Sequence, residues 1–426
     1  MRIRKLYLKD IGPFDEVEFE FKPQEKGKAE IHILTGPNGS GKTTVLRSMA
    51  VFFDTSSRTY PAFEKRIHDQ ESSKIEFSFD KNLAAPKSVL PAIVNVADFS
   101  TPPPPFLAKF LETAKKIRSN DIKAFAYSGY HLVKAHRVNA IQQLEIDPFK
   151  DAVQFDKDIK SDADLNQWIA NSISKRALER DKNNLERANK FASAMTILGR
   201  IISTLAGYEI NFDLNTSPIL LLVQADNVVL DFDVLPDGLR SCIRWIGDLL
   251  MRLDQINWDN NLPVNEQDII LFLDEVEVHL HPTWQRKILP VVQKLFPNAQ
   301  IFLTTHSPFV VNSIDGAAIY ELKVEAGKAS LGEVTESKSS RSYQNVLREV
   351  FDIDEDFGQP IQLDLDSFYQ YRNEILAGNE SNEDKFIKLA KKLAKESIEQ
   401  ESVELQSIIG FELRQINRIK GKNYSV

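Results

Sequence analysis

One segment constrains the fold of this chain more than any other: Gly36-Pro37-Asn38-Gly39-Ser40-Gly41-Lys42-Thr43. It matches the pattern G-x-x-x-x-G-K-[ST] and lies between a strand-like run that ends at Leu34 and a helical run. Glycines allow successive backbone amides to turn toward a phosphate, and the helix directs its positive N-terminal end at the same anion. The pattern therefore predicts a nucleoside triphosphate site within an α/β fold.

The residues of this loop have separable expected roles. Lys42 supplies a positive charge to the β- and γ-phosphates, and the Thr43 hydroxyl is a ligand for Mg²⁺. Lys42 therefore contributes to catalysis as well as to binding. We predict that ATP contacts the run Gly36, Pro37, Asn38, Gly39, Ser40, Gly41, Lys42, Thr43 and Thr44.

A second motif is an apolar run that ends in two acids, Ile269-Ile270-Leu271-Phe272-Leu273-Asp274-Glu275. Such a run is typical of a buried parallel strand that presents its acids at its C-terminal edge. We expect Asp274 to hold Mg²⁺ and Glu275 to orient and deprotonate the attacking water.

The third motif, Thr304-Thr305-His306-Ser307, ends the strand-like run IFLTT. A helix after Pro282 connects it to the acidic strand, and a βαβ unit of this kind makes parallel neighbours. His306 is thus predicted at the same sheet edge as Glu275, within reach of a γ-phosphate.

The order of these motifs, with Leu235-Pro236-Asp237-Gly238 before the acidic strand, resembles the ABC ATPase superfamily. The opening LYLKDIGPFDEVEFEF is similar to the first strands of RecF- and SMC-type heads. The phrases HLHP and TTHSPFVV resemble stand-alone bacterial ATPases related to the OLD nucleases. Those relatives include AAA-type ATPase subunits of the anti-phage systems Septu, retron-associated cassettes and PARIS. The resemblance covers residues 1–50 and 219–325.

This resemblance implies an α/β ABC-ATPase head: a mixed sheet around the P-loop core, with a helical insertion and a helical C-terminal extension. We divide the chain into residues 1–105 and 206–340 as the two parts of the head, 106–205 as a mainly helical insertion, and 341–426 as the extension. The prolines from Pro102 to Pro105 form a stiff break at the first boundary. A strand is possible at 124–130 within the insertion.

In the superfamily, the signature loop of one subunit caps the ATP bound to the other subunit. The run from Leu235 to Ser241 occupies that position, and Pro236 stands where the family has a serine. Gly238 is retained, and Arg240 is a candidate cation supplied in trans, its alternative being an ordinary surface residue. The resemblance implies a homodimer or higher homo-oligomer with composite ATP sites. The Q-loop glutamine is not obvious: Gln142 and Gln143 are candidates, and each also fits the surface of a helix.

Composition limits the other possibilities. The net charge of -8 gives no sign of a broad basic face, although a local nucleic-acid contact stays possible. The chain lacks an apolar run of the roughly 20 residues that span a bilayer, and its N-terminus lacks a signal-peptide core, so we expect a cytoplasmic protein without a membrane partner. His279 and His281 lack a third ligand for zinc, and the buried-looking Cys242 is the single cysteine.

The function implied is an ATP-hydrolysing switch that controls a separate effector, a nuclease or a toxin, in anti-phage defence. The alternative is a RecF-like, ATP-dependent DNA-binding protein of recombination or repair. DNA cleavage by this chain alone is not expected, because Asp364-Leu365-Asp366 lies in a helical segment rather than in a TOPRIM-like strand arrangement. The amphipathic tail from Glu383 to Lys422 either packs on the head or in a homodimer, or docks the effector.

Overall fold

A computed structural model describes residues 2–25, 27–53, 73–80, 94–95, 123–134, 136, 138, 140–155, 162–216, 219–226, 228–351, 357–399 and 402–421. The chain forms two compact units, Met1–Phe351 and Asp352–Val426. The predicted break at Pro102–Pro105 lies outside the described residues.

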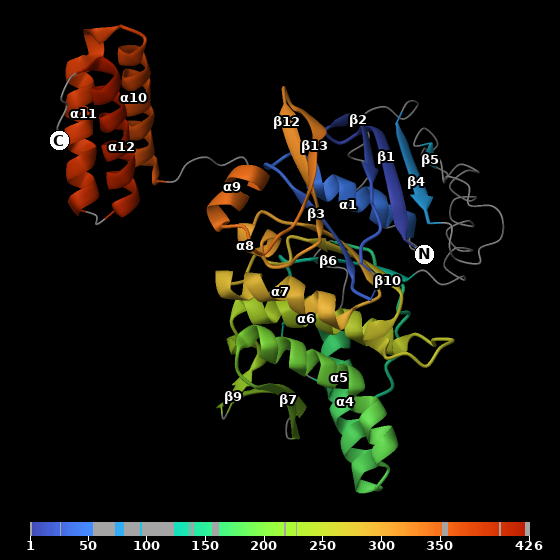
Figure 1. Cartoon of the computed structure of the whole chain (residues 1–426). Coiled ribbons are helices and arrows are strands. Elements are labelled where there is room, and N and C mark those ends of the chain that lie inside the picture. Colours follow the sequence, from blue (N-terminus) through green and yellow to red (C-terminus); the bar gives the residue numbers. More distant parts are fainter. Residues whose placement is uncertain are drawn as a thin grey trace. The chain divides into compact units, whose positions relative to one another are not determined.

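A six-stranded sheet forms the centre of the first unit (Figure 1). Its first five strands are parallel, and the last pairs antiparallel with its neighbour. In spatial order they are β6 (Lys123–Ser128), β10 (Ile269–Asp274), β11 (Ala299–Thr304), β3 (Glu30–Thr35), β12 (Ala318–Glu325) and β13 (Lys328–Glu336). Because parallel strands end at one edge, the residues that follow β3, β6, β10 and β11 are brought together there.

Both faces of this sheet are buried, which explains the unbroken apolar run of β10. Ile270 and Phe272 pack in one cluster with α1 (Lys42–Ala50), whereas Leu271 and Leu273 pack in the opposite cluster. Helices α5 (Leu185–Ala206), α6 (Asp237–Gln255) and α7 (Pro282–Leu295) contribute to that second cluster and lie together on one side of the sheet (Figure 1).

A second, antiparallel sheet covers α1 and extends the core on its side. Its order is β2 (Phe14–Glu20), β1 (Ile3–Ile11), β4 (Lys74–Phe79) and β5 (Val94–Asn95).

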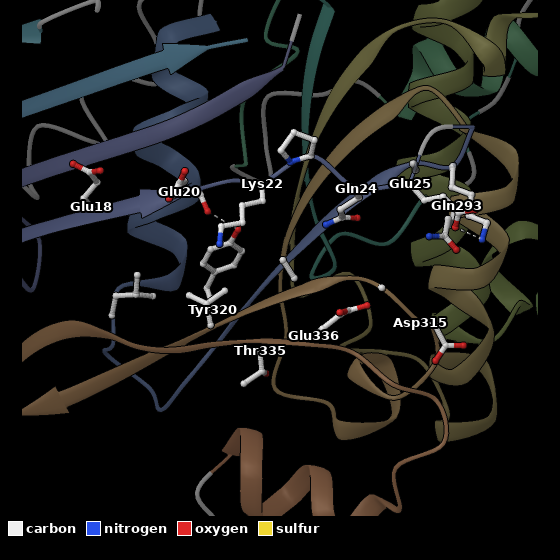
Figure 2. Close-up of a pocket in the computed structure, with 17 residues that line it drawn as sticks. Glu18, Glu20, Lys22, Gln24, Glu25, Gln293, Asp315, Tyr320, Thr335 and Glu336 are labelled. Carbon is white, nitrogen blue, oxygen red and sulfur yellow. Dashed lines mark hydrogen bonds and ion pairs between the residues drawn. The ribbon is translucent and has the colours of Figure 1, made fainter.

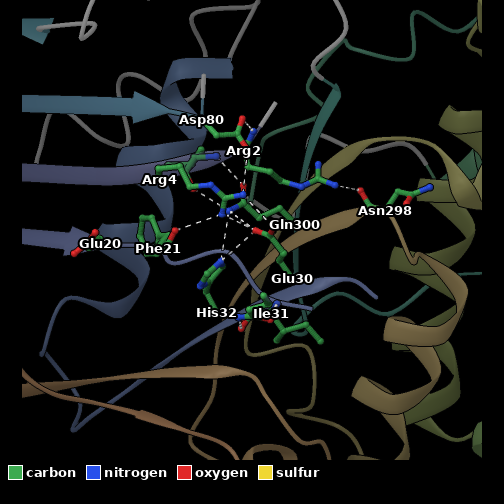
Figure 3. Close-up of polar contacts among 12 residues, drawn as sticks. Arg2, Arg4, Glu20, Phe21, Glu30, Ile31, His32, Asp80, Asn298 and Gln300 are labelled. Carbon is green, nitrogen blue, oxygen red and sulfur yellow. Dashed lines mark hydrogen bonds and ion pairs between the residues drawn. The ribbon is translucent and has the colours of Figure 1, made fainter. Parts of the chain in front are cut away.

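Arg4 of β1 joins this sheet to the central one (Figure 3). Its guanidinium donates two hydrogen bonds to the Glu30 carboxylate, at 2.8 and 3.0 Å, and one to Asp80 at 3.1 Å. The side chain of Gln300 pairs with the backbone of Ile3 through bonds of 2.8 and 2.9 Å. Both contacts are shielded from water, so they fix how the two sheets pack.

Helix α4 (Asp162–Asp181) packs against α5, and a small antiparallel sheet follows them. That sheet contains β7 (Ile210–Thr216), β8 (Ile219–Ala225) and β9 (Val228–Asp231). The strand at 124–130 was predicted, and β6 confirms it; β6 belongs to the central sheet rather than to an insertion. Residues 140–155 contain no helix, so the expectation that Gln142 and Gln143 lie on a helix is wrong.

After β11, the chain forms the short helix α8 (Pro308–Val311), then β12 and β13, and finally α9 (Tyr343–Phe351). The second unit contains α10 (Gln359–Leu376), α11 (Glu383–Glu399) and α12 (Val403–Lys420). These helices share a core of their own, in which the Phe368 and Phe386 rings stack at 4.8 Å. The apolar faces of the tail therefore cover one another and α10.

The fold class predicted from the sequence is confirmed: an α/β head with a mixed sheet around the glycine-rich loop, and a helical C-terminal part. Within the described part of the chain, no helix is both long enough and apolar enough to cross a membrane.

Candidate functional site

The glycine-rich loop joins β3 to α1. Gly36, Gly39 and Gly41 have φ angles of 135°, 82° and 90°, a region that side chains disfavour, and α1 begins directly after Gly41. The loop turns tightly, with the Ser40 amide donating to Pro37 O at 3.2 Å. Asn38 and Gly39 lie exposed at its tip, while Thr44 is buried in α1 beside Gly12. The residues predicted to contact the nucleotide, Gly36 to Thr44, therefore form one loop and the first turn of α1.

Lys42 lies across this loop. Its Nζ donates to Gly36 O and Pro37 O, at 2.9 Å each. Burial lowers the pKa of Lys42, and the charges of Glu275 and Asp274 act in the opposite direction. The Ser40 hydroxyl is buried and has no hydrogen-bond partner among the described residues. An ammonium bonded to two loop carbonyls, beside a buried hydroxyl without a partner among the described residues, fits a phosphate chain.

Asp274 meets Thr43 at the end of β10. Thr43 Oγ1 donates to Asp274 Oδ1 at 3.0 Å, and Thr304 Oγ1 donates to the same oxygen at 2.7 Å. Burial raises the pKa of Asp274, and the two hydroxyl bonds oppose that effect. A hydroxyl and a carboxylate at the mouth of a phosphate loop are the hard oxygen donors that Mg²⁺ prefers, so these residues fit the predicted metal.

Glu275 follows in a left-handed backbone conformation, with φ 49°, that turns the chain out of the strand. Its Oε1 lies 3.5 Å from Nε2 of His306, which follows β11. The Glu275 side chain is 20% exposed and that of His306 is 38% exposed, so both reach solvent. Burial, and then the charge of Lys42, lower the pKa of His306. The structure therefore brings Lys42, Thr43, Asp274, Glu275 and His306 to one sheet edge.

Glu277, which the sequence reasoning missed, braces the loop that carries His306. Thr305 Oγ1 donates to its buried carboxylate, and the Ser307 amide donates to Thr305 Oγ1 at 2.9 Å. Ser307 Oγ also bonds Gln285 Oε1 at 2.6 Å. Burial raises the pKa of Glu277 to about 7. The sequence did contain a signal for this role, because Glu277 is a charged residue between the apolar residues Val276 and Val278.

Tyr130 was also missed. It follows β6, and its hydroxyl donates to Glu275 Oε2 at 2.5 Å. The strand at 124–130 was foreseen, but its place beside β10 follows only from the sheet order.

The predicted pair Gly238 and Arg240 lies in the first turn of α6, and among the described residues Arg240 bonds neighbours other than the glycine-rich loop. A Cβ on Gly238 would stand 2.8 Å from His279 O, which explains a glycine there on packing grounds. Arg240 Nε donates to Val133 O at 3.0 Å, and its guanidinium lies 3.6 Å from Asp233. A role for Arg240 in trans stays a prediction.

The other side chains considered from the sequence have ordinary environments. Gln142 and Gln143 are exposed in an irregular segment. His281 caps α7 by accepting from the Thr283 amide, and Cys242 is buried. Within the described ranges, no group of three or more His, Cys, Asp or Glu side chains could hold a metal ion.

A cavity of about 710 Å³ lies elsewhere, between β2 and the β12–β13 pair (Figure 2). Tyr320 lines it and donates to Glu20 O at 3.0 Å. Its charged lining contains five acidic side chains against two lysines, which repels phosphate: Glu18, Glu20, Glu25, Asp315, Glu336, Lys22 and Lys28. This cavity is therefore a poor nucleotide site.

Comparison with known proteins identifies relatives. The family model described as "AAA domain, putative AbiEii toxin, Type IV TA system" matches residues 31–312. The chain is 35% identical to the Retron Ec83 probable ATPase of Escherichia coli over 159 residues, a match that covers 35% of this chain and 29% of that protein. It is 24% identical to the Septu protein PtuA of Bacillus thuringiensis, covering 75% of this chain and 74% of that protein. The predicted resemblance to Septu and retron ATPases is confirmed.

Among solved structures, the chain is similar to an SMC head bound to the C-terminal winged-helix domain of ScpA. The TM-score is 0.46, with 14% identity, and the match covers 79% of this chain and 98% of that one.

Proposed function

This chain belongs to the family of AAA domains described as putative AbiEii toxin, Type IV TA system, and on that premise we propose that it binds and hydrolyses ATP as a nucleotide-driven switch. The observation that carries the proposal is the meeting of Thr43 with Asp274, and of Glu275 with His306, beside Lys42. These five side chains come from three distant segments of the chain.

The proposed chemistry assigns one task to each group. Lys42 leaves its loop carbonyls to bond the β- and γ-phosphates, while the loop amides hold the remaining oxygens. Thr43 and Asp274 would hold Mg²⁺, which neutralises charge on the phosphates when bound. Glu275 accepts a proton from the attacking water, and His306 bonds the γ-phosphate with its exposed imidazole.

A second copy of the chain is part of the proposal. Gly238 and Arg240 lie in the first turn of α6, and in the described part of the chain Arg240 bonds Val133 and pairs with Asp233 rather than with the glycine-rich loop. A head-to-tail homodimer would bring α6 of one copy to the nucleotide of the other. We propose that ATP closes this dimer and hydrolysis opens it.

We propose that the switch controls a separate effector, a nuclease or a toxin, in the cytoplasm. Relatives named as a Septu protein and as retron ATPases support a place in anti-phage defence. The helical second unit, with its own core, is a candidate attachment point.

The test is Glu275→Gln, which keeps the size of the side chain but removes the base. We expect ATP hydrolysis to fall by at least about 100-fold while ATP stays bound. Size-exclusion chromatography with light scattering should then show a dimer that persists in ATP. Undiminished hydrolysis by this variant would contradict the proposal.

A further inference from the structure

Tyr130 contacts the proposed catalytic base because of the register of two strands. β6 and β10 are parallel, and Ser128 lies opposite Asp274. The Gly129 amide then donates to Asp274 O at 3.0 Å, so the two segments leave the sheet side by side. Tyr130 follows Gly129 and Glu275 follows Asp274, and the Tyr130 hydroxyl donates to Glu275 Oε2 at 2.5 Å.

The two oxygens of Glu275 have different neighbours. Tyr130 donates to Oε2, whereas Oε1 faces His306 Nε2 at 3.5 Å. The bond to Glu275 raises the pKa of Tyr130 to about 12, so its hydroxyl keeps its proton at neutral pH. A carboxylate with one oxygen tied down presents the other in a fixed direction.

Close backbone packing fixes where Tyr130 begins. A Cβ on Gly129 would stand 2.0 Å from Glu275 O and 2.7 Å from Val276 Cα, so no larger residue fits. The tyrosine is therefore carried by a backbone in direct contact with that of the base. Tyr130 as a whole is 48% exposed, so the hydroxyl bond, rather than burial of the residue, defines its contact with the site.

The same segment is fastened to α6 at both of its ends. Ser241 Oγ donates to Gly129 O at 3.0 Å in a buried bond. The Val133 amide donates to Arg240 O at 3.4 Å, and Arg240 Nε returns a bond to Val133 O at 3.0 Å. Residues 129–133 thus connect the first turns of α6 to the proposed base.

We infer that Tyr130 is a positioning residue for Glu275, and that residues 129–133 transmit the position of α6 to it. When a second copy docks its nucleotide against α6, the segment holds the Tyr130 hydroxyl on Oε2 and directs Oε1, which faces His306, to receive the proton of water. This inference rests on the proposed function and adds the link between dimer closure and the base.

The first experiment compares Tyr130→Phe with wild type in steady-state ATP hydrolysis by the full chain. The loss of orientation is expected to lower kcat by about tenfold and to leave KM for ATP within about twofold. The control is Tyr7→Phe, because Tyr7 also bonds a glutamate, Glu16, but on the antiparallel sheet. Its kcat and KM should equal those of wild type.

The second experiment tests the link to α6 with Ser241→Ala, alone and combined with Tyr130→Phe. We expect the single change to lower kcat by a few fold and to have no further effect in the Tyr130→Phe background. Equal effects of Ser241→Ala in both backgrounds would show that α6 does not act through Tyr130.

The outcomes separate this inference from the proposed function. If wild-type protein hydrolyses ATP and Tyr130→Phe does so with the same kcat, the inference is overturned and the proposed function stands. If Tyr130→Phe raises KM and kcat stays constant, the tyrosine acts in binding and not on the base, which also overturns it. If wild-type protein neither binds nor hydrolyses ATP, the proposed function itself fails.

Discussion

The Thr43 hydroxyl donates a hydrogen bond of 3.0 Å to the carboxylate of Asp274, a residue 231 positions further along the chain. Thr43 is fixed by the first turn of α1, and Asp274 by the C-terminal end of β10. The strand β11 lies between β10 and β3 in the sheet, and Thr304 at its end bonds the same Asp274 oxygen. The order of the strands in the sheet therefore brings Thr43 and Asp274 together.

The first prediction concerns this pair. Thr43→Val keeps the volume of the side chain and removes the hydroxyl, so Mg²⁺ should no longer strengthen ATP binding. We expect ATP affinity in Mg²⁺ to fall by about tenfold, to the value measured in excess chelator. Titration with a fluorescent ATP analogue, with and without Mg²⁺, measures both values. The control is Thr204→Val on the exposed face of α5.

The second prediction concerns stability. The side chains of Arg4 and Glu30 are only 16% and 13% exposed, so Arg4→Ala leaves a shielded carboxylate without its cation. We expect a loss of about 2–3 kcal/mol in the free energy of unfolding. Chemical denaturation measures this loss. The transition to follow is the one that Mg-ATP shifts, because it reports on the unit that contains the glycine-rich loop. Lys5→Ala breaks the exposed Lys5–Glu18 pair and should lower the free energy of unfolding far less, because water screens that pair. If Arg4→Ala and Lys5→Ala lowered the free energy of unfolding equally, burial of the Arg4–Glu30 pair would not explain its contribution to stability.

The third prediction concerns pH. The ordinary pKa of a glutamate is near 4.5, and burial raises that of Glu277 to about 7. The folded chain therefore keeps this proton between pH 4.5 and 7 while the unfolded chain has lost it, and stability from this group falls as pH rises across that window.

Glu277→Gln keeps an oxygen that can accept from Thr305 and removes the titration. The loss of unfolding free energy between pH 5 and pH 8 should therefore be smaller in the variant, by roughly 1–3 kcal/mol. Unfolding curves at several pH values measure this difference. The control is Glu325→Gln at an exposed position, which should follow wild type. A pH profile unchanged by Glu277→Gln would contradict the assignment.

Much of the site was predictable because its residues sit in local patterns. The glycine-rich loop and the apolar run before Asp274 carry their own strand and helix signals. The βαβ rule then placed His306 at the same edge as Glu275. None of these steps required knowledge of a distant contact.

The remainder depends on contacts that no local pattern encodes. Tyr130 reaches Glu275 only because β6 pairs beside β10, and a strand after a long intervening segment can take either edge of a sheet. The bond from Arg240 to Val133 likewise joins residues 107 positions apart. The sequence pattern of the tail predicted an apolar face, but not that the face would be covered by α10.

ATP binding by the purified 426-residue chain tests the central claim most directly. Calorimetric titration in Mg²⁺ should show saturable binding that Lys42→Ala weakens by about tenfold to 100-fold, because the ammonium proposed to bond the β- and γ-phosphates is lost. The exposed Lys28→Ala should bind as wild type does. Absence of binding by the wild-type chain, or equal affinity in Lys42→Ala, would contradict the account.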